Sequence, residues 1–417
     1  MKNRFFALAL VFCMLLAMAV IPAHAETGEK VKIRLVYWNE EKTMKAFLDL
    51  AQEKLPHIEL EYQFIPVDQI DGTINTQLQA GEGPDILHNG HSVPAIKAGY
   101  LLPLDDQEFI NNYSKESIDA LRVDGKIYGV PGVGWYEGMF FNKEIFEKYG
   151  LTPPKTFAEL MNIHKVLKEN GVKPQAMGAN SWEPMMKSTL GLAVCDWLMK
   201  TEEGKQFDYS IKEGTGKFEG SALKGIIETW SQYIKDGYIT PDMLEVSYDN
   251  ALVEFASGKA AMWESGPWAV AAIKETNPEL KFDMFPFVGT EEGESWLIGG
   301  SGVTFGVNAS SKHSKEALEV LALMATQEGQ IALLKGSEGS NSYLKGVQME
   351  LPEFYASAAE TLNANRVYCP WFIWGDGNGA YIETYGKGLQ EYLQNAKDID
   401  TVLREVDEKV FAEHAQQ

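Results

Sequence analysis

The feature that most constrains the fold is an alternation of strand and helix patterns between residues 31 and 87. Three segments have the apolar pattern of core strands, and two between them have helical periodicity, with Thr43 as the expected N-cap of the first helix. In chain order these are a strand at 31–37, a helix from Thr43 that ends before Pro56, a strand at 58–67, a helix at 70–78 and a strand at 85–87. This order predicts an α/β domain with a mostly parallel sheet.

The first 25 residues have the features of a secretory signal peptide. Lys2 and Arg4 precede an apolar run from Phe5 to Ile21, and Ala23-His24-Ala25 places small residues around a cleavage point. Polar residues follow directly, so we do not expect the run to span a membrane, and no later stretch is long enough to do so. The mature chain should begin near Glu26 and be secreted across the cytoplasmic membrane, into the periplasm or to the cell exterior.

Length, charge and cysteine content further limit the domain organisation and the partners that we expect for this protein. About 390 mature residues favour two domains. Removing the signal peptide takes the formal charge from −22 to −24, which disfavours nucleic acid and anionic membranes as partners. Export permits a disulfide between Cys195 and Cys369, and two separate buried thiols are the alternative. His88 and His91 have no third ligand nearby in the sequence, so we expect neither a metal nor a cofactor.

The rest of the chain separates into three parts. A glycine-rich stretch at 125–143 has two extended apolar pieces, which we interpret as strands flanking a crossing between domains. The helix-rich region after it has four helical patterns, at 157–170, 185–200, 223–237 and 248–258. A strand at 281–287, an extended piece at 299–308 and one helix at 314–330, capped by Ser314, suggest a return to the first domain. The C-terminal part is helical, with an aromatic interruption at CPWFIWGDGNG.

The ten tryptophans fall into two groups. Trp197 and Trp230 lie in amphipathic helix patterns and should be core residues. The other eight lie in loops or at element ends, several beside carboxylates: Trp38, Trp135, Trp182, Trp263, Trp268, Trp296, Trp371 and Trp374. Flat rings beside hydrogen-bond acceptors suit a sugar, which has apolar C–H faces and a belt of hydroxyls. The pattern therefore predicts a carbohydrate site, although packing of any single ring onto the core is the competing explanation.

A glycosidase would use similar residues. Glu137, Glu183 and Glu264 could supply the paired carboxylates, which must lie roughly 5–10 Å apart. The chain has neither eight strand–helix repeats nor a run of short strands, two common hydrolase layouts. We therefore predict a binding protein and keep the enzyme as the alternative.

Six stretches, in this order along the chain, resemble the extracellular solute-binding protein family 1, the carbohydrate-binding proteins of ABC transporters that include maltose-binding protein. These are WNE after the first strand, GEGPDI (81–86), DGKIYGVP (124–131), FFNKEIFEKYGLTPPKTFAELM (140–161), GKAAMWESGPW (258–268) and GGSGVTFGVNASSKHSKEALEVLALMATQEGQ (299–330). The resemblance implies a periplasmic-binding-protein-like fold with two α/β lobes, a hinge and an interlobe ligand cleft. The first lobe would be 26–134 plus 303–342, and the second, helix-rich lobe 135–302 plus 343–417.

The resemblance also implies a function and part of a site. Such proteins are monomers that close around a sugar and deliver it to a membrane permease without a cofactor. In them the Gly266-Pro267-Trp268 segment ends a helix at the cleft, which makes Trp268 the first stacking candidate, with Trp263 and Glu264 beside it. Trp371 or Trp374 matches a second aromatic position. LHNGHS departs from the maltodextrin-binding pattern, so maltose specificity is not implied.

The resemblance and residue chemistry together suggest further polar and aromatic candidates. They are Asn39, Glu40, His88, Asn89, Trp135, Glu137, Trp182, Gly299 and Gly300. We expect Asp85 to hold its own loop instead of a ligand. A non-sugar solute stays open as an alternative: a glycerophosphodiester if the cleft is basic, or a polyamine if it is acidic.

Overall fold

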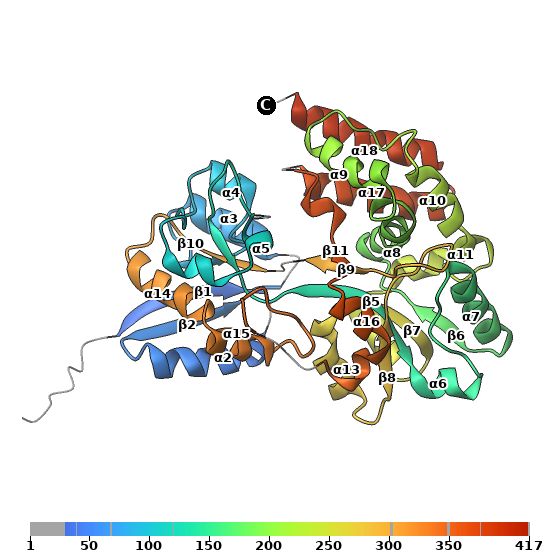
Figure 1. Ribbon diagram of the computed structural model, residues 1–417, viewed down its shortest axis with the longest axis horizontal. Coiled ribbons are helices and arrows are strands. Elements are labelled where there is room, and N and C mark those ends of the chain that lie inside the picture. Colours follow the sequence, from blue (N-terminus) through green and yellow to red (C-terminus); the bar gives the residue numbers. More distant parts are fainter. Residues whose placement is uncertain are drawn as a thin grey trace, which may run out of the picture.

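The computed structural model describes residues 30–38, 40–66, 69–119, 121–300, 303–347, 351–375 and 377–415. The expected signal peptide at 1–25 and the candidate Asn39 lie outside these ranges. Within them, the chain forms two β-sheets side by side, each covered by its own helices (Figure 1).

The first sheet has five strands in the order β2-β1-β3-β10-β4. Their bounds are β1 Val31–Tyr37, β2 Ile58–Phe64, β3 Ile86–His88, β4 Gly129–Pro131 and β10 Thr304–Val307. β1 is parallel to β2 and β3, whereas β10 is antiparallel to both of its neighbours, β3 and β4. Four strands therefore share one direction, and the predicted mostly parallel sheet is confirmed. The return of the chain to this sheet is confirmed for 304–307, but the strand predicted at 281–287 lies in the second sheet, so its assignment to the first domain is wrong.

Helices cover both faces of this sheet. Their bounds are α2 Glu41–Lys54, α3 Ile70–Gln79, α4 Val93–Lys97, α5 Lys115–Asp119, α14 Ser314–Met324 and α15 Gln327–Leu334, with a 3-10 turn η1 at Glu108–Asn112. Successive residues of β1 point to opposite faces. Leu35 lies in one apolar cluster with Phe47 of α2, and Val36 lies in another with Ile74 of α3. The strand is thus buried on both sides.

Two predicted helix starts are wrong. Glu40 is the N-cap of α2 and His313 that of α14, so Thr43 and Ser314 lie inside these helices. Thr43 Oγ1 instead donates to Glu40 O at 2.8 Å. The single helix predicted at 314–330 is in fact two helices, because Thr326 caps a new one by accepting from Gly329 N at 3.0 Å.

Among the described residues, no single helix combines the length and apolar composition of a membrane span. α14 and α15 pass that criterion only when taken together, and they are bent by 77° relative to each other.

The second sheet has the order β11-β9-β5-β7-β6, and β8 also pairs with β5. Its strands are β5 Trp135–Asn142, β6 Lys173–Ala176, β7 Ala260–Ser265, β8 Phe282–Phe285, β9 Leu297–Gly300 and β11 Val367–Tyr368. The helices and turns of this part are α6 Lys143–Lys148, α7 Phe157–Glu169, α8 Glu183–Ala193, η2 Val194–Leu198, α9 Glu202–Lys212, α10 Leu223–Trp230, α11 Gln232–Lys235, η3 Pro241–Glu245, α12 Tyr248–Ala256, η4 Pro267–Ala269, α13 Val270–Thr276, η5 Glu353–Ala358, α16 Ala359–Asn363, η6 Pro370–Phe372, α17 Asn378–Leu393 and α18 Ile399–His414.

The central strand β5 is buried on both faces. Met139 faces an apolar cluster that includes residues of α7, α8, α17 and α18, whereas Phe140 faces a cluster that includes residues of α12 and α13. Trp197 and Trp230 lie in the first of these clusters, as predicted. Many aromatic side chains of this part of the chain therefore lie in the core, and the aromatic side chains outside it are the candidates for a binding site.

The chain crosses between the sheets at one edge of the first sheet. β1, β3 and β4 end there and β10 begins there. The segment between β4 and β5 is bonded to two other segments: Gly132 N donates to Val303 O and Gly134 N to Asn341 O, both at 2.7 Å. Side chains at the ends of strands are thereby brought next to the crossing.

The two cysteines of the described chain are not bridged. Both Cys195 and Cys369 are free and buried. Cys195 Sγ donates to Phe287 O at 3.3 Å, and burial raises the pKa of each thiol above its usual range. The alternative of a disulfide is therefore wrong, and the alternative of two separate buried thiols is confirmed.

Candidate functional site

Four aromatic side chains meet where β5 begins. The centroid of Trp135 lies 6.3 Å from that of Trp268, 6.3 Å from that of Trp371 and 6.2 Å from that of Phe372. We call these four residues the aromatic cluster. Phe372 is 38% exposed, Trp135 and Trp268 are half-buried, and Trp371 is buried. Three segments distant in sequence thus build an apolar surface that still reaches solvent.

The Gly-Pro-Trp segment places Trp268 in this cluster. β7 ends at Ser265, and the turn η4 leads into α13, so the segment begins a helix. The expectation that it ends one is wrong. Proline suits this position because the first turn of a helix does not need its N–H. The indole is fixed by Trp268 Nε1, which donates to Tyr248 OH at 2.9 Å.

Gly266 is required by the ring of Trp268, which lies over it. A Cβ at this position would lie 2.3 Å from a ring carbon of Trp268 and 2.3 Å from Tyr136 O. We expect Gly266→Ala to displace the indole and to lower the free energy of unfolding by about 1–3 kcal/mol. Urea unfolding and the tryptophan emission spectrum measure the two effects. Gly225→Ala is the control, since a Cβ there meets nothing within 4 Å, and equal stability of the two variants would contradict the prediction.

A group of charged side chains adjoins the aromatic cluster. Lys187 of α8 places its Nζ 2.6 Å from Glu137 Oε1 and 2.8 Å from Glu183 Oε2. The same Nζ lies 6.0 Å from the ring centroid of Trp135. We call Glu137, Glu183, Lys187 and Glu264 the charge cluster. Lys187 joins it to the aromatic cluster.

Glu264 belongs to the charge cluster through its strand. It pairs with Met139 across β5 and β7, which puts it on the same face as Glu137. Glu264 Oε2 is buried, and no described residue donates a hydrogen bond to it. Burial, reinforced by the charge of Glu137, raises the pKa of Glu264 well above its usual range.

The pKa values of the other groups in the charge cluster are also shifted. Burial raises the pKa of Glu137, although Lys187 opposes this, and the charge of Lys187 lowers the pKa of Glu183. Burial alone would lower the pKa of Lys187, but the two glutamates outweigh it and raise this pKa. The cluster thus has one ammonium group, which is bonded to two of its three carboxylates. Such a site favours a proton, a hydroxyl donor or a cation, and disfavours an anion.

The first sheet contributes histidines at the end of β3. His88 Nε2 lies 3.3 Å from Asp71 Oδ1, and Asn89 has a positive φ of 62°. His91 Nδ1 lies 2.7 Å from Thr304 Oγ1, and its ring centroid is 6.2 Å from that of Phe372. Burial lowers the pKa of His91 to about 4, so this contact between the turn after β3 and the turn η6 is made by a neutral ring at pH 7.

Asp85 holds its loop, as expected. Its Oδ2 accepts from Arg34 N at 2.9 Å and its Oδ1 accepts from Ser311 Oγ at 2.5 Å. The carboxylate therefore ties the turn before β3 to β1 and to the loop after β10.

Two predicted aromatic candidates are core residues. Trp263 is 2% exposed and packs 6.1 Å from Phe255, because neighbours in a strand point to opposite faces and Glu264 takes the other one. Trp374 is 1% exposed, and its Nε1 donates to Asp208 Oδ1 at 2.7 Å. The structure therefore does not bring either ring to the aromatic cluster.

Other predicted candidates divide between the cluster and the rest of the surface. A Cβ on Gly300 would lie 2.9 Å from the ring of Phe372, and one on Gly299 would lie 2.2 Å from Trp135 O, so both glycines support the aromatic cluster. Trp182 instead packs over Gly386 of α17. Glu40 is exposed and pairs with Lys42 at 2.9 Å.

Sequence reasoning missed four residues of this region: Phe372, Lys187, Tyr248 and His91. Phe372 directly follows a predicted ring, and Lys187 lies four positions after Glu183 on a helix, where such a pair stabilises. Either signal could have been used. The contacts of Tyr248 and His91 depend on segments that are distant in sequence, and no local pattern indicates them.

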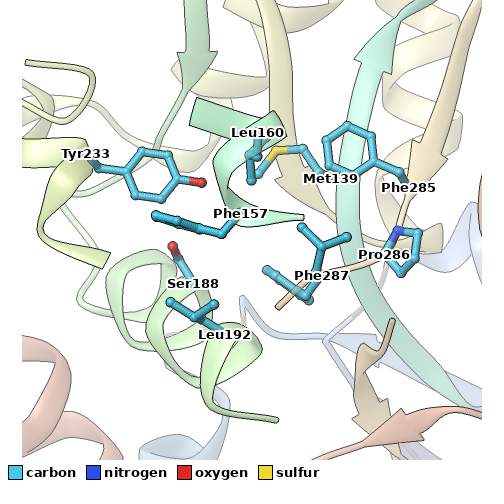
Figure 2. A pocket seen from close by; sticks show the side chains of 10 residues that line it. Met139, Phe157, Leu160, Ser188, Leu192, Tyr233, Phe285, Pro286 and Phe287 are labelled. Carbon is cyan, nitrogen blue, oxygen red and sulfur yellow. The ribbon is translucent and has the colours of Figure 1, made fainter. Parts of the chain in front are cut away.

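A small cavity lies in the core behind β5, lined by Tyr233, Ser188, Phe157 and other side chains (Figure 2). Its volume is about 20 Å³. That is room for about one water molecule, so this cavity is not a site for a solute.

Comparisons with known proteins agree on one kind of molecule. The sequence profile of the bacterial extracellular solute-binding protein family matches residues 37–331. A multiple sugar-binding protein of Streptococcus mutans is 25% identical over 334 residues, which are 78% of this chain and 78% of that protein.

Two solved structures show the same fold. One, from work on xylan utilisation by Caldanaerobius polysaccharolyticus, has a TM-score of 0.77 and 22% identity and covers 91% of this chain and 100% of its own. The other, RafE in complex with raffinose, has a TM-score of 0.73 and 20% identity, with 91% and 99% covered. The predicted two-lobed α/β fold is confirmed.

Proposed function

The chain belongs to the bacterial extracellular solute-binding protein family, and from this premise we propose that it captures a mono- or oligosaccharide and delivers it to an ABC importer. The carrying observation is that the aromatic cluster adjoins the charge cluster, with Lys187 Nζ 6.0 Å from the Trp135 centroid. Rings cover the C–H faces of a pyranose, and carboxylates accept from its hydroxyls. The names of the similar proteins, which refer to multiple sugars and to raffinose, support this class of solute.

The proposed mechanism uses the two lobes and the crossing between them. The lobes are 26–134 plus 303–342, and 135–302 plus 343–417. A solute held by both lobes binds the closed form more tightly and shifts the population towards it. The contact of His91 with Phe372 supports closure at this place, because it joins the turn that follows β3 of the first sheet to the turn η6 that follows β11 of the second. In this mechanism the signal peptide directs the chain across the cytoplasmic membrane, where the protein acts as a monomer. A permease would bind its closed form, and no covalent bond is made or broken.

The charge cluster helps to distinguish between the alternative functions, which are a receptor for another solute and a glycosidase. The charge cluster has three carboxylates and one ammonium group, two of the carboxylates being paired with Lys187, so it disfavours a phosphodiester and leaves a polyamine as the competing solute. A glycosidase would need one carboxyl to donate a proton to the leaving group and a second to act as nucleophile or base. Glu137 is 4% exposed and is bonded to Lys187, which argues against either role for it.

The test is a titration of the ligand-stripped mature protein with raffinose, xylo-oligosaccharides, monosaccharides and spermidine, with tryptophan fluorescence as the readout. We expect a saturable change with a sugar that is recovered unaltered. Breakdown of the sugar would establish a glycosidase. A response to spermidine alone would establish a polyamine receptor.

A further inference from the structure

We propose that Asp208 is a positioning residue for the aromatic cluster. Its carboxylate fixes both ends of the loop from Tyr368 to Trp374, which carries Trp371 and Phe372, and so sets where these two rings stand. This inference rests on the proposed function, because it concerns the presentation of rings to a solute.

The geometry is that of one acceptor group between two donors. Asp208 lies on α9 and is 0% exposed. Its Oδ2 accepts from the hydroxyl of Tyr368, the last residue of β11, and its Oδ1 accepts from Trp374 Nε1 at 2.7 Å. The five residues between the two donors, 369–373, therefore form a loop whose two ends are bonded to the same carboxylate.

Within the described residues, the loop has few other hydrogen bonds to the core. Tyr368 pairs with Ile298 of β9, and the ring of Trp374 packs 5.0 Å from that of Phe218. Between these ends, Phe372 N is bonded within the loop, to Cys369 O. The bonds to Asp208 thus determine how far the turn η6, which carries the two rings, extends towards Trp135 and His91.

Burial of a carboxylate destabilises the fold unless hydrogen-bond donors compensate for it. Its presence at this place therefore indicates that its two hydrogen bonds matter. Burial raises the pKa of Asp208 to about 6, although both hydrogen bonds lower it. Removing the carboxylate would leave the buried Nε1 of Trp374 and the partly buried hydroxyl of Tyr368 without their acceptor, which is unfavourable. The loop should then move to satisfy them.

Asp407 provides a matched control in the same core. It lies on α18, is 3% exposed and accepts from Phe218 N at 2.6 Å and from Glu219 N at 3.0 Å. Like Asp208, it is a buried carboxylate with two donors. Unlike the bonds of Asp208, these two bonds are made to residues outside the loop.

The experiment compares Asp208→Asn with Asp407→Asn in the full mature chain. Asparagine replaces one acceptor oxygen by a donor, so it cannot accept from two donors on opposite oxygens. Hydrogen exchange of peptides covering 366–375 is measured without ligand, and raffinose, or the sugar that saturates the wild type, is titrated by fluorescence. Tyr368→Phe removes a single bond and serves as a milder variant should Asp208→Asn fold poorly.

We expect both asparagine variants to be less stable, but only Asp208→Asn to increase exchange in 366–375, and to weaken sugar binding at least about tenfold. Tyr368→Phe should show a smaller effect of the same kind. Equal exchange in the two asparagine variants would overturn the inference. Increased exchange with unchanged affinity would also overturn it, while leaving the proposed function intact. If no sugar bound the wild type, the proposed function would fail, and the exchange data would still decide whether Asp208 fixes the loop.

Discussion

Replacement of Trp268 by alanine is expected to weaken sugar binding by roughly 30- to 150-fold, equivalent to about 2–3 kcal/mol. The indole is half-buried beside Trp135 and is oriented by its bond to Tyr248, so a ring is held in place before any solute arrives. A pre-positioned ring loses little conformational entropy on binding, so most of its contact contributes to affinity. Titration of the variant by isothermal calorimetry measures the loss directly and does not depend on tryptophan emission.

The matched control is Trp182→Ala. Trp182 is also half-buried, but it packs over Gly386 of α17 and makes no ring contact with the aromatic cluster among the described residues. Both variants should lose stability through lost apolar contact. Only Trp268→Ala should lose affinity. A comparable loss for Trp182→Ala would mean that the solute lies elsewhere, nearer the start of α8.

Much of the fold follows from local sequence patterns. The strand predicted at 31–37 has the observed bounds, since apolar residues alternate with Lys32 and Arg34 before an apolar run at 35–37, and both patterns are typical of strands. The helix predicted at 157–170 is observed at Phe157–Glu169, where Thr156 caps it by accepting from Glu159 N. The caps of α2 and α14 could not be found in this way, because neither has a side-chain cap bond. The preference of certain side chains for the N-cap position gives no signal where a helix begins without a hydrogen bond from a side-chain cap.

The candidate site was only partly predictable, for a different reason. Tryptophans outside core patterns indicated Trp135, Trp268 and Trp371, which the structure brings together. The same criterion also selected Trp263, since it depends on where a ring lies in the chain and not on which face of β7 it occupies. Once 260–265 is known to be a strand, alternation assigns Trp263 to the core and Glu264 to the charge cluster. Lys187 was missed because a helical pattern does not show which side chains of other segments the helix faces, and Glu137 is 50 residues away in sequence.

The second large effect is expected for Lys187→Met. Lys187 is the one cation bonded to Glu137 and Glu183 among the described residues, and its side chain is only 15% exposed. Removing one partner of a buried ion pair leaves the other charge uncompensated, which typically costs about 3–5 kcal/mol. We expect a loss of this size in the free energy of unfolding at pH 7, measured in urea. Lys173→Met is the control, because its pair with Glu254 is about one-third exposed and should contribute less than about 1 kcal/mol.

The pH dependence of this loss separates charge from packing. Burial raises the pKa of Glu137 and Glu264 in the folded protein, so each carboxylate destabilises the fold when ionised and ceases to do so as pH falls towards its unfolded pKa. Without Lys187 this penalty grows, and the difference between variant and wild type should shrink from pH 8 to pH 5. Adding Glu137→Gln to Lys187→Met should recover part of the loss at pH 7. A deficit independent of pH, and unchanged in the double variant, would mean that Lys187 stabilises the fold through its aliphatic chain and that the carboxylates are free to bind solute without it.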